Sequence, residues 1–106
     1  MYDMKWSDTE RKLARQVFVS ALATELAEVI ADFKQRAAIA EVPDDLWEIA
    51  EHLQSKRRDI DQKYDYRYSQ LILIFARLVR EGRIQEAQLA ALSDEKLDQI
   101  RRVASF

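Results

Sequence analysis

Apolar residues recur at helical spacing along nearly the whole chain, and this pattern predicts helices joined by short connections. From Ser7 to the turn at Pro43 they return every three or four residues, with no glycine or proline between. Ser7 and Glu10 form the S-x-x-E pattern of a capping box, in which each residue satisfies a free backbone amide of the other. The first helix is therefore predicted to run from Asp8 to about Ala40.

This first helix is too long for a compact domain of its own. At about 1.5 Å per residue it would measure roughly 50 Å. A globular chain of this length is only about 35 Å across. The apolar face of the protruding part needs a cover, and a second copy of the chain would supply one. A helix that kinks and folds back between Ala37 and Glu41 is the alternative.

A second helix is predicted from Pro43 to about Lys63, because proline suits the first helical position and acidic residues favour the first turn. Its apolar residues fall within one narrow sector, which is typical of a face that packs against a core. These residues are Leu46, Ile49, Leu53, Ile60 and Tyr64.

Arg57 interrupts this apolar stripe, and Trp47 lies beside it. A guanidinium among apolar side chains needs a carboxylate or carbonyl groups, because an unpaired charge removed from water costs several kcal/mol. Glu51 and Asp61 are the candidate partners, within the chain or across a two-fold axis. Arginine and tryptophan are enriched among the residues that dominate protein interfaces. We interpret this helix as a partner-binding element, with a core position for Trp47 as the alternative.

The last third of the chain predicts further helices after a break within residues 62–69. Asp65 and Ser69 are the candidate N-caps beyond that break. A strongly apolar helix follows and ends at Gly82, which suits the left-handed conformation of a C-cap. A short helix over residues 84–92 and a final helix capped by Ser93 complete the chain.

Composition supports an all-α fold with few turns. The 106 residues include one glycine and one proline, while 48% of residues are hydrophobic and 34% are charged. We predict a single all-helical domain over residues 1–106. Long helices over about residues 7–62 form one part of it, and helices over about residues 65–106 form the other.

The chain lacks most groups that catalysis or metal binding requires. It has no cysteine, and His52 is the single histidine, so triads and multi-histidine sites cannot be assembled within one chain. Glu48 lies four residues before His52, but no second such pair accompanies it, and we interpret His52 as a surface residue. The prediction is a protein with no enzymatic activity, no cofactor and no metal.

Charge and hydropathy argue against a membrane or nucleic-acid role. The formal net charge is −2 with both signs interspersed, which is unlike the basic surface of a nucleic-acid binder. The longest apolar run, residues 71–76, is far shorter than the roughly 20 residues that cross a bilayer. No signal peptide is visible, and a soluble cytoplasmic protein is the expectation. Nucleic-acid binding through Arg57, Arg58, Arg101 and Arg102 is a third alternative for function.

Several motifs resemble one known family. They are D-D-L-W at 44–47, S-K-R at 55–57, I-D at 60–61, K-Y-D at 63–65 and Arg67, followed by an apolar helix ending in E-G at 81–82, with Trp6 near the start. Together they are similar to the fluorescence recovery protein family of cyanobacteria. The resemblance implies an all-α homodimer whose long helices form a stalk and whose C-terminal helices form a head.

The same resemblance implies a function. Members of this family are not enzymes; they bind the light-activated red form of the orange carotenoid protein through its C-terminal domain. They speed its return to the orange form and so end energy quenching at the thylakoid-bound phycobilisome. In physical terms this is differential binding of two conformations of the partner.

The resemblance also assigns residues. It places partner binding at Trp47, Glu51, Arg57, Leu73 and Gln99, and the dimer interface at Trp6, Ile30, Leu46 and Arg57. The chain departs from the family pattern at five positions: Ala50 replaces a histidine, Glu51 an aspartate, Gln62 a glycine, Leu73 a phenylalanine and Gln99 a lysine. Because these changes alter the contact surface, a homodimeric helical adaptor with a different protein partner is the alternative function.

Overall fold

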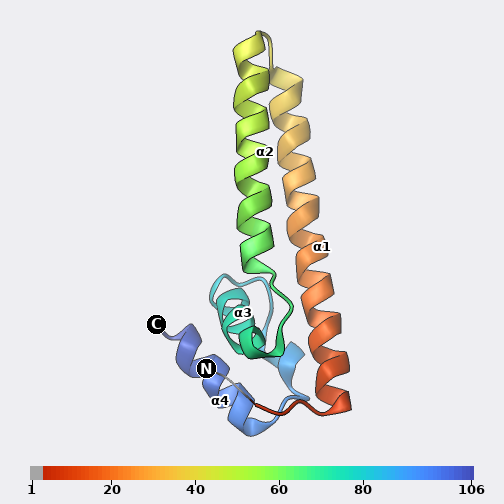
Figure 1. Cartoon of the computed structure of the whole chain (residues 1–106), viewed down its shortest axis with the longest axis vertical. Coiled ribbons are helices and arrows are strands. Elements are labelled where there is room, and N and C mark those ends of the chain that lie inside the picture. Colours follow the sequence, from red (N-terminus) through yellow and green to blue (C-terminus); the bar gives the residue numbers. More distant parts are fainter. Residues whose placement is uncertain (1–3) are drawn as a thin grey trace. The chain divides into compact units, whose positions relative to one another are not determined.

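The computed structural model describes residues 4–106 and contains helices but no strand in that range. The elements are α1 (Asp8–Ile39), α2 (Pro43–Lys63), α3 (Tyr68–Arg80), the short 3₁₀ helix η1 (Glu86–Leu89) and α4 (Asp94–Ala104) (Figure 1). The predicted all-α class is confirmed. The predicted bounds of the first two helices are confirmed to within one residue, including the turn before Pro43.

Contacts divide the described chain into two compact units. Leu22–Tyr64 forms one, which we call the hairpin unit. The chain up to Ala21 and Asp65–Phe106 form the other, which we call the terminal unit. Helix α1 thus begins in the terminal unit and ends in the hairpin unit. This grouping places residues 8–21 with the C-terminal helices, whereas the sequence predicts parts over residues 7–62 and 65–106.

In the hairpin unit, the second half of α1 and the whole of α2 lie antiparallel, side by side (Figure 1). The turn that joins them is closed by Asp45, whose carboxylate accepts hydrogen bonds from the backbone amides of Glu41 at 2.9 Å and Val42 at 3.2 Å. These bonds satisfy amides at the N-terminus of α2 that have no partner within the helix. The turn therefore holds the hairpin without any glycine.

The terminal unit contains a conventional apolar core, built mainly by α3 with η1 and α4. Its largest fully buried side chains are Leu71, Ile72, Phe75, Leu78, Leu89 and Ile100. Gly82 ends α3 with a φ of 74°, so the predicted left-handed cap is confirmed. Ser93 caps α4 by accepting a hydrogen bond from the Lys96 amide at 3.3 Å, as predicted.

Two predictions about this unit are wrong. Arg67, in extended conformation, is the N-cap of α3, and neither Asp65 nor Ser69 takes that place. The reason is local: the Asp65 carboxylate accepts hydrogen bonds from the guanidinium of Arg67, and its carbonyl accepts one from the Arg67 amide at 2.8 Å. The helix predicted over residues 84–92 is only the four-residue η1, which ends in i to i+3 hydrogen bonds.

The capping box at the start of α1 is confirmed and extends further than predicted. The Ser7 amide donates to Glu10 at 2.9 Å, and the Glu10 amide donates to the Ser7 hydroxyl at 3.2 Å. Glu10 also accepts from the Ser93 amide at 2.9 Å and from Lys96 Nζ at 3.2 Å. One buried carboxylate thereby joins the start of α1 to the start of α4.

Within residues 4–106, no helix has the length and hydrophobicity needed to cross a membrane.

Candidate partner-binding surface

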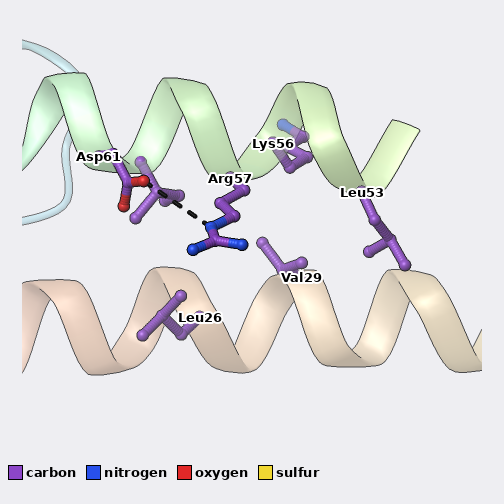
Figure 2. Close-up of a pocket in the computed structure, with 7 residues that line it drawn as sticks. Leu26, Val29, Leu53, Lys56, Arg57 and Asp61 are labelled. Carbon is purple, nitrogen blue, oxygen red and sulfur yellow. Dashed lines mark ion pairs between the residues drawn. The ribbon is translucent and has the colours of Figure 1, made fainter. Parts of the chain in front are cut away.

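Arg57 projects from α2 into a groove of the hairpin unit (Figure 2). The groove has a volume of about 160 Å³. Its apolar lining comes from Leu26 and Val29 of α1 and from Leu53 and Ile60 of α2, and Lys56 and Asp61 complete it. The structure thus places Arg57 among apolar side chains of both helices, as its position in the stripe predicts.

The environment of Arg57 differs from the prediction in one respect. Asp61 is confirmed as an ion-pair partner, with 3.9 Å between Arg57 Nε and Asp61 Oδ2. Packing within one chain does not bury the guanidinium, because the Arg57 side chain is 85% exposed. Its burial across a two-fold axis stays a prediction. The groove is open, and Tyr64, which the sequence pattern places beside Arg57, is buried against Glu25 instead. An exposed pair of this kind contributes at most about 1 kcal/mol.

Trp47 and Leu46 are exposed near the start of α2. Trp47 is 63% exposed and Leu46 54%, so a core position for either is wrong within a single chain. Trp47 lies beside the apolar stripe of α2 rather than on it, and Leu46 lies in the first turn of the helix, next to the turn that joins α1 and α2. Glu51, one turn after Trp47, is exposed as well.

Helix α1 contributes an exposed apolar stripe to the same unit. Leu26, Ile30 and Phe33 are spaced four and three residues apart, so they share one helix face, and all three are exposed. Soluble monomers rarely leave large apolar surfaces uncovered, and those that occur mark interaction sites. The hairpin unit therefore presents apolar anchors from both of its helices together with one arginine.

A buried polar cluster lies at the other end of the hairpin unit, and sequence reasoning missed it. Glu25 Oε1 accepts a hydrogen bond from Lys63 Nζ and another, of 2.6 Å, from the Tyr64 hydroxyl. All three residues are buried. The partners are 38 and 39 residues apart in sequence, so no local pattern could pair them. Because a buried charge requires its partner, the cluster fixes the register of α1 against α2.

His52 takes part in a second polar link across the hairpin. Its Nε2 lies 3.1 Å from Asp32 Oδ2, which also accepts a 2.8 Å hydrogen bond from Arg36 Nε. The hydrogen bond from Arg36, more than the proximity of His52, holds the pKa of Asp32 below its usual range. No group of three or more potential metal ligands occurs in the described part of the chain.

The remaining residues assigned by resemblance lie in the terminal unit. Leu73 on α3 and Gln99 on α4 are both half-buried. Trp6 is 6% exposed, and its ring packs against Tyr68 with 5.7 Å between centroids. Its Nε1 is buried and has no hydrogen-bond partner among residues 4–106. The predicted site residues are thus divided, with Ile30, Leu46, Trp47, Glu51 and Arg57 in the hairpin unit and Trp6, Leu73 and Gln99 in the terminal unit.

Comparisons with known proteins agree on one family. The model of the photoprotection regulator fluorescence recovery protein matches residues 6–104. The fluorescence recovery protein of Synechocystis sp. PCC 6803 is 36% identical over 99 residues, which cover 93% of this chain and 91% of that protein. The solved structure of the Fremyella diplosiphon protein is similar with a TM-score of 0.90 and 33% identity, and that of the Synechocystis protein with 0.90 and 35%. Each similarity covers 96% of this chain and 100% of the other.

Proposed function

This chain belongs to the fluorescence recovery protein family of photoprotection regulators, and we propose that it acts as a homodimer on a carotenoid-binding photoprotein. In this proposal it binds the C-terminal domain of the red, photoactivated orange carotenoid protein and accelerates its return to the orange form, which ends quenching at the phycobilisome. It does so in the cytoplasm, without a cofactor and without catalysing a reaction. The family membership carries the proposal.

The exposed residues of the hairpin unit support a binding role. Trp47 offers a large rigid side chain that is 63% exposed, and Arg57 offers a guanidinium above an apolar groove. Residues of these two types carry much of the binding energy in protein complexes once water is excluded around them. Because Trp47 is largely exposed, it contributes little to packing within the chain, and binding to another protein would account for its presence there.

The mechanism follows from population-shift thermodynamics. A binding protein can change the balance between two conformations of its partner only by as much as its affinity for them differs. To accelerate recovery, it must bind the transition state between the red and orange forms more tightly than the red form. We therefore expect contacts to surfaces of the photoprotein that approach each other during that transition.

The test is a recovery assay. Photoactivated orange carotenoid protein is mixed in the dark with this protein, and the loss of red absorbance is timed. We expect the rate constant to rise with the concentration of this protein and to saturate. An unchanged rate at excess protein would remove this specific function.

Matched variants sharpen the assay. Trp47→Ala is expected to lower the acceleration severalfold, whereas Ile39→Ala, which truncates another exposed apolar side chain at the end of α1, is expected to leave it unchanged. A purely structural effect is excluded if both variants keep the helical circular dichroism of the parent protein. Equal acceleration by both variants would contradict a role of Trp47.

The second candidate is a helical adaptor of the same fold with a different protein partner. The departures from the family pattern at Ala50, Leu73 and Gln99 favour it, since changed side chains on the contact surface offer a partner different contacts. For this function the recovery assay would show no effect, while affinity capture returns another protein and Trp47→Ala abolishes the capture.

Nucleic-acid binding has less support. Of its four candidate arginines, Arg101 is engaged by Glu86 and by Asp98, the latter at 3.1 Å. The hydrogen bond that Arg101 donates to Glu86 raises the pKa of Arg101 above its usual range. A guanidinium paired with two carboxylates offers little charge to a phosphate backbone.

A further inference from the structure

Two arginines in the terminal unit lie on tyrosine rings. The Arg11 guanidinium carbon is 5.6 Å from the ring centroid of Tyr68, and that of Arg15 is 4.7 Å from the centroid of Tyr66. The two rings meet edge to face at 5.8 Å. Cation–π contacts hold each guanidinium in place and leave its N–H groups available to carboxylates. We call Arg11, Arg15, Tyr66 and Tyr68 the basic face.

Within residues 4–106, the positive charge of the basic face is barely compensated. Arg15 has no ion pair in that range, and Arg11 is paired there with Asp8 alone, which is 4.0 Å away and fully exposed. Residues 11–24 include three basic residues and no acidic one. In the described part of the chain, this stretch therefore presents weakly compensated positive charge, on arginines whose side chains are ordered by stacking.

The hairpin unit carries the opposite feature. Asp44, Glu48 and Glu51 occupy positions i, i+4 and i+7 of α2, which places them on one face, and all three are exposed. None of them forms an ion pair within residues 4–106. Residues 41–51 include five acidic residues and neither lysine nor arginine. We call these three residues the acidic ridge.

We propose that, in the homodimer, the acidic ridge of each copy binds the basic face of the other. The inference rests on the homodimer of the proposed function and specifies which surfaces meet. Arg11 and Arg15 are four residues apart on α1, and Asp44 and Glu48 are four apart on α2, so the two pairs have the same spacing of about 6 Å. A two-fold axis forms the contact twice, because each copy supplies both surfaces.

This contact gives the dimer a function in partner binding. Trp47 and Glu51 lie at the acidic ridge, so the second copy's tyrosines would lie beside them. The surface offered to a third protein would then contain residues of both chains. The apolar stripe of α1 supplies hydrophobic area in the same assembly, and the charges fix its register, since like charges in contact disfavour other arrangements.

A charge-swap experiment tests the contact. The first variant is Arg11→Glu with Arg15→Glu, and the second is Asp44→Lys with Glu48→Lys. Each variant alone places like charges in both contacts, so its self-association should weaken about tenfold or more relative to the parent protein. In an equimolar mixture, both contacts pair opposite charges again, and the mixed dimer should regain most of the lost affinity.

Sedimentation velocity at several concentrations measures the association, with one variant labelled so that mixed dimers are distinguished. Arg58→Glu with Arg102→Glu makes the same charge change outside the basic face and should associate like the parent. If the glutamate variant of the basic face does not fold by circular dichroism, Arg11→Gln with Arg15→Gln replaces it, with an expected loss of about threefold. The parent dimer should also weaken as salt is raised.

The outcomes separate this inference from the proposed function. Variants that dimerise as tightly as the parent, or a mixture that regains nothing, would overturn the contact while leaving the homodimer intact. A parent protein that sediments as a single chain would overturn the homodimer itself.

Discussion

The two units of this chain bury side chains of different kinds. The terminal unit encloses large apolar side chains completely, among them Phe75, Leu71 and Ile100. The hairpin unit buries only Ile49 and Tyr64 of its apolar residues, alongside the charged pair Glu25 and Lys63. The first unit has the apolar core that stabilises a small domain by itself. The second exposes the side chains that would form such a core, which is the arrangement expected of a unit completed by another protein.

The largest predicted effect concerns the core of the terminal unit. Phe75→Ala should lower the free energy of unfolding by about 3–5 kcal/mol, because it removes a fully buried ring and leaves a cavity. Urea denaturation followed by circular dichroism measures the loss. Ile39→Ala, at a residue that is 75% exposed, should change stability by no more than about 0.5 kcal/mol. If both variants lost the same stability, the contrast between the units would be wrong.

The next effect concerns the one charged pair that the hairpin unit buries. Glu25→Ala leaves the ammonium of Lys63 buried without its carboxylate and should cost about 3 kcal/mol. The double variant Glu25→Leu with Lys63→Met replaces the pair by apolar side chains of similar size, and we expect it to recover most of that loss. Thermal denaturation of the single and double variants measures the difference. A double variant as unstable as the single one would show that the charges themselves are required.

Local signals account for what the sequence predicted well. The capping box of Ser7 and Glu10, the proline at the start of α2 and the glycine after α3 each act within one turn of the helix they delimit. Helix bounds and the all-α class follow from such signals. The 3₁₀ conformation of η1 does not follow from such signals, because a short run of this kind fits either an α-helix or a 3₁₀ helix.

The candidate site was less predictable, for a physical reason. A periodic pattern shows which side chains of α2 share a face, and it correctly placed Arg57 beside Leu53 and Ile60. Whether a side chain of that helix is covered depends also on what packs against it, and the structure leaves Leu46 and Trp47, near the start of α2, exposed. The pairing of Lys63 with Glu25 likewise depends on how α1 lies against α2, which no local pattern of residues reveals. Residues assigned by resemblance alone, such as Leu73 and Gln99, stay predictions.

A smaller effect is expected at the groove of the hairpin unit. Arg57→Glu places a carboxylate four residues from Asp61, its present ion-pair partner, and should weaken dimerisation and the acceleration of recovery together, each by about tenfold, because a charge within an interface is reversed. Arg58→Glu makes the same change on the exposed neighbouring residue and serves as the control. Sedimentation and the recovery assay provide the two readouts. A fully dimeric and fully active Arg57→Glu variant would refute this role.

The smallest effect is a pH dependence in the terminal unit, at the carboxylate of Glu10. Burial raises the pKa of Glu10, but hydrogen bonds from the Ser7 and Ser93 amides and from Lys96 outweigh burial and hold the pKa below its usual range. The unfolded chain therefore binds this proton at higher pH than the folded chain does. The resulting stability is complete above the unfolded pKa of about 4.3 and is lost as the pH falls through the folded value.

Glu10→Gln isolates this contribution. At neutral pH we expect a loss of about 1 kcal/mol, since the amide oxygen of glutamine still accepts one of the hydrogen bonds. As the pH falls below the unfolded pKa of about 4.3, the stability of the variant should fall less steeply than that of the parent. Glu95→Gln, an exposed residue at the start of α4, should follow the parent curve at every pH. Parallel curves for the parent and Glu10→Gln would mean that the carboxylate joining α1 to α4 stabilises the unit by hydrogen bonding alone, independent of its charge.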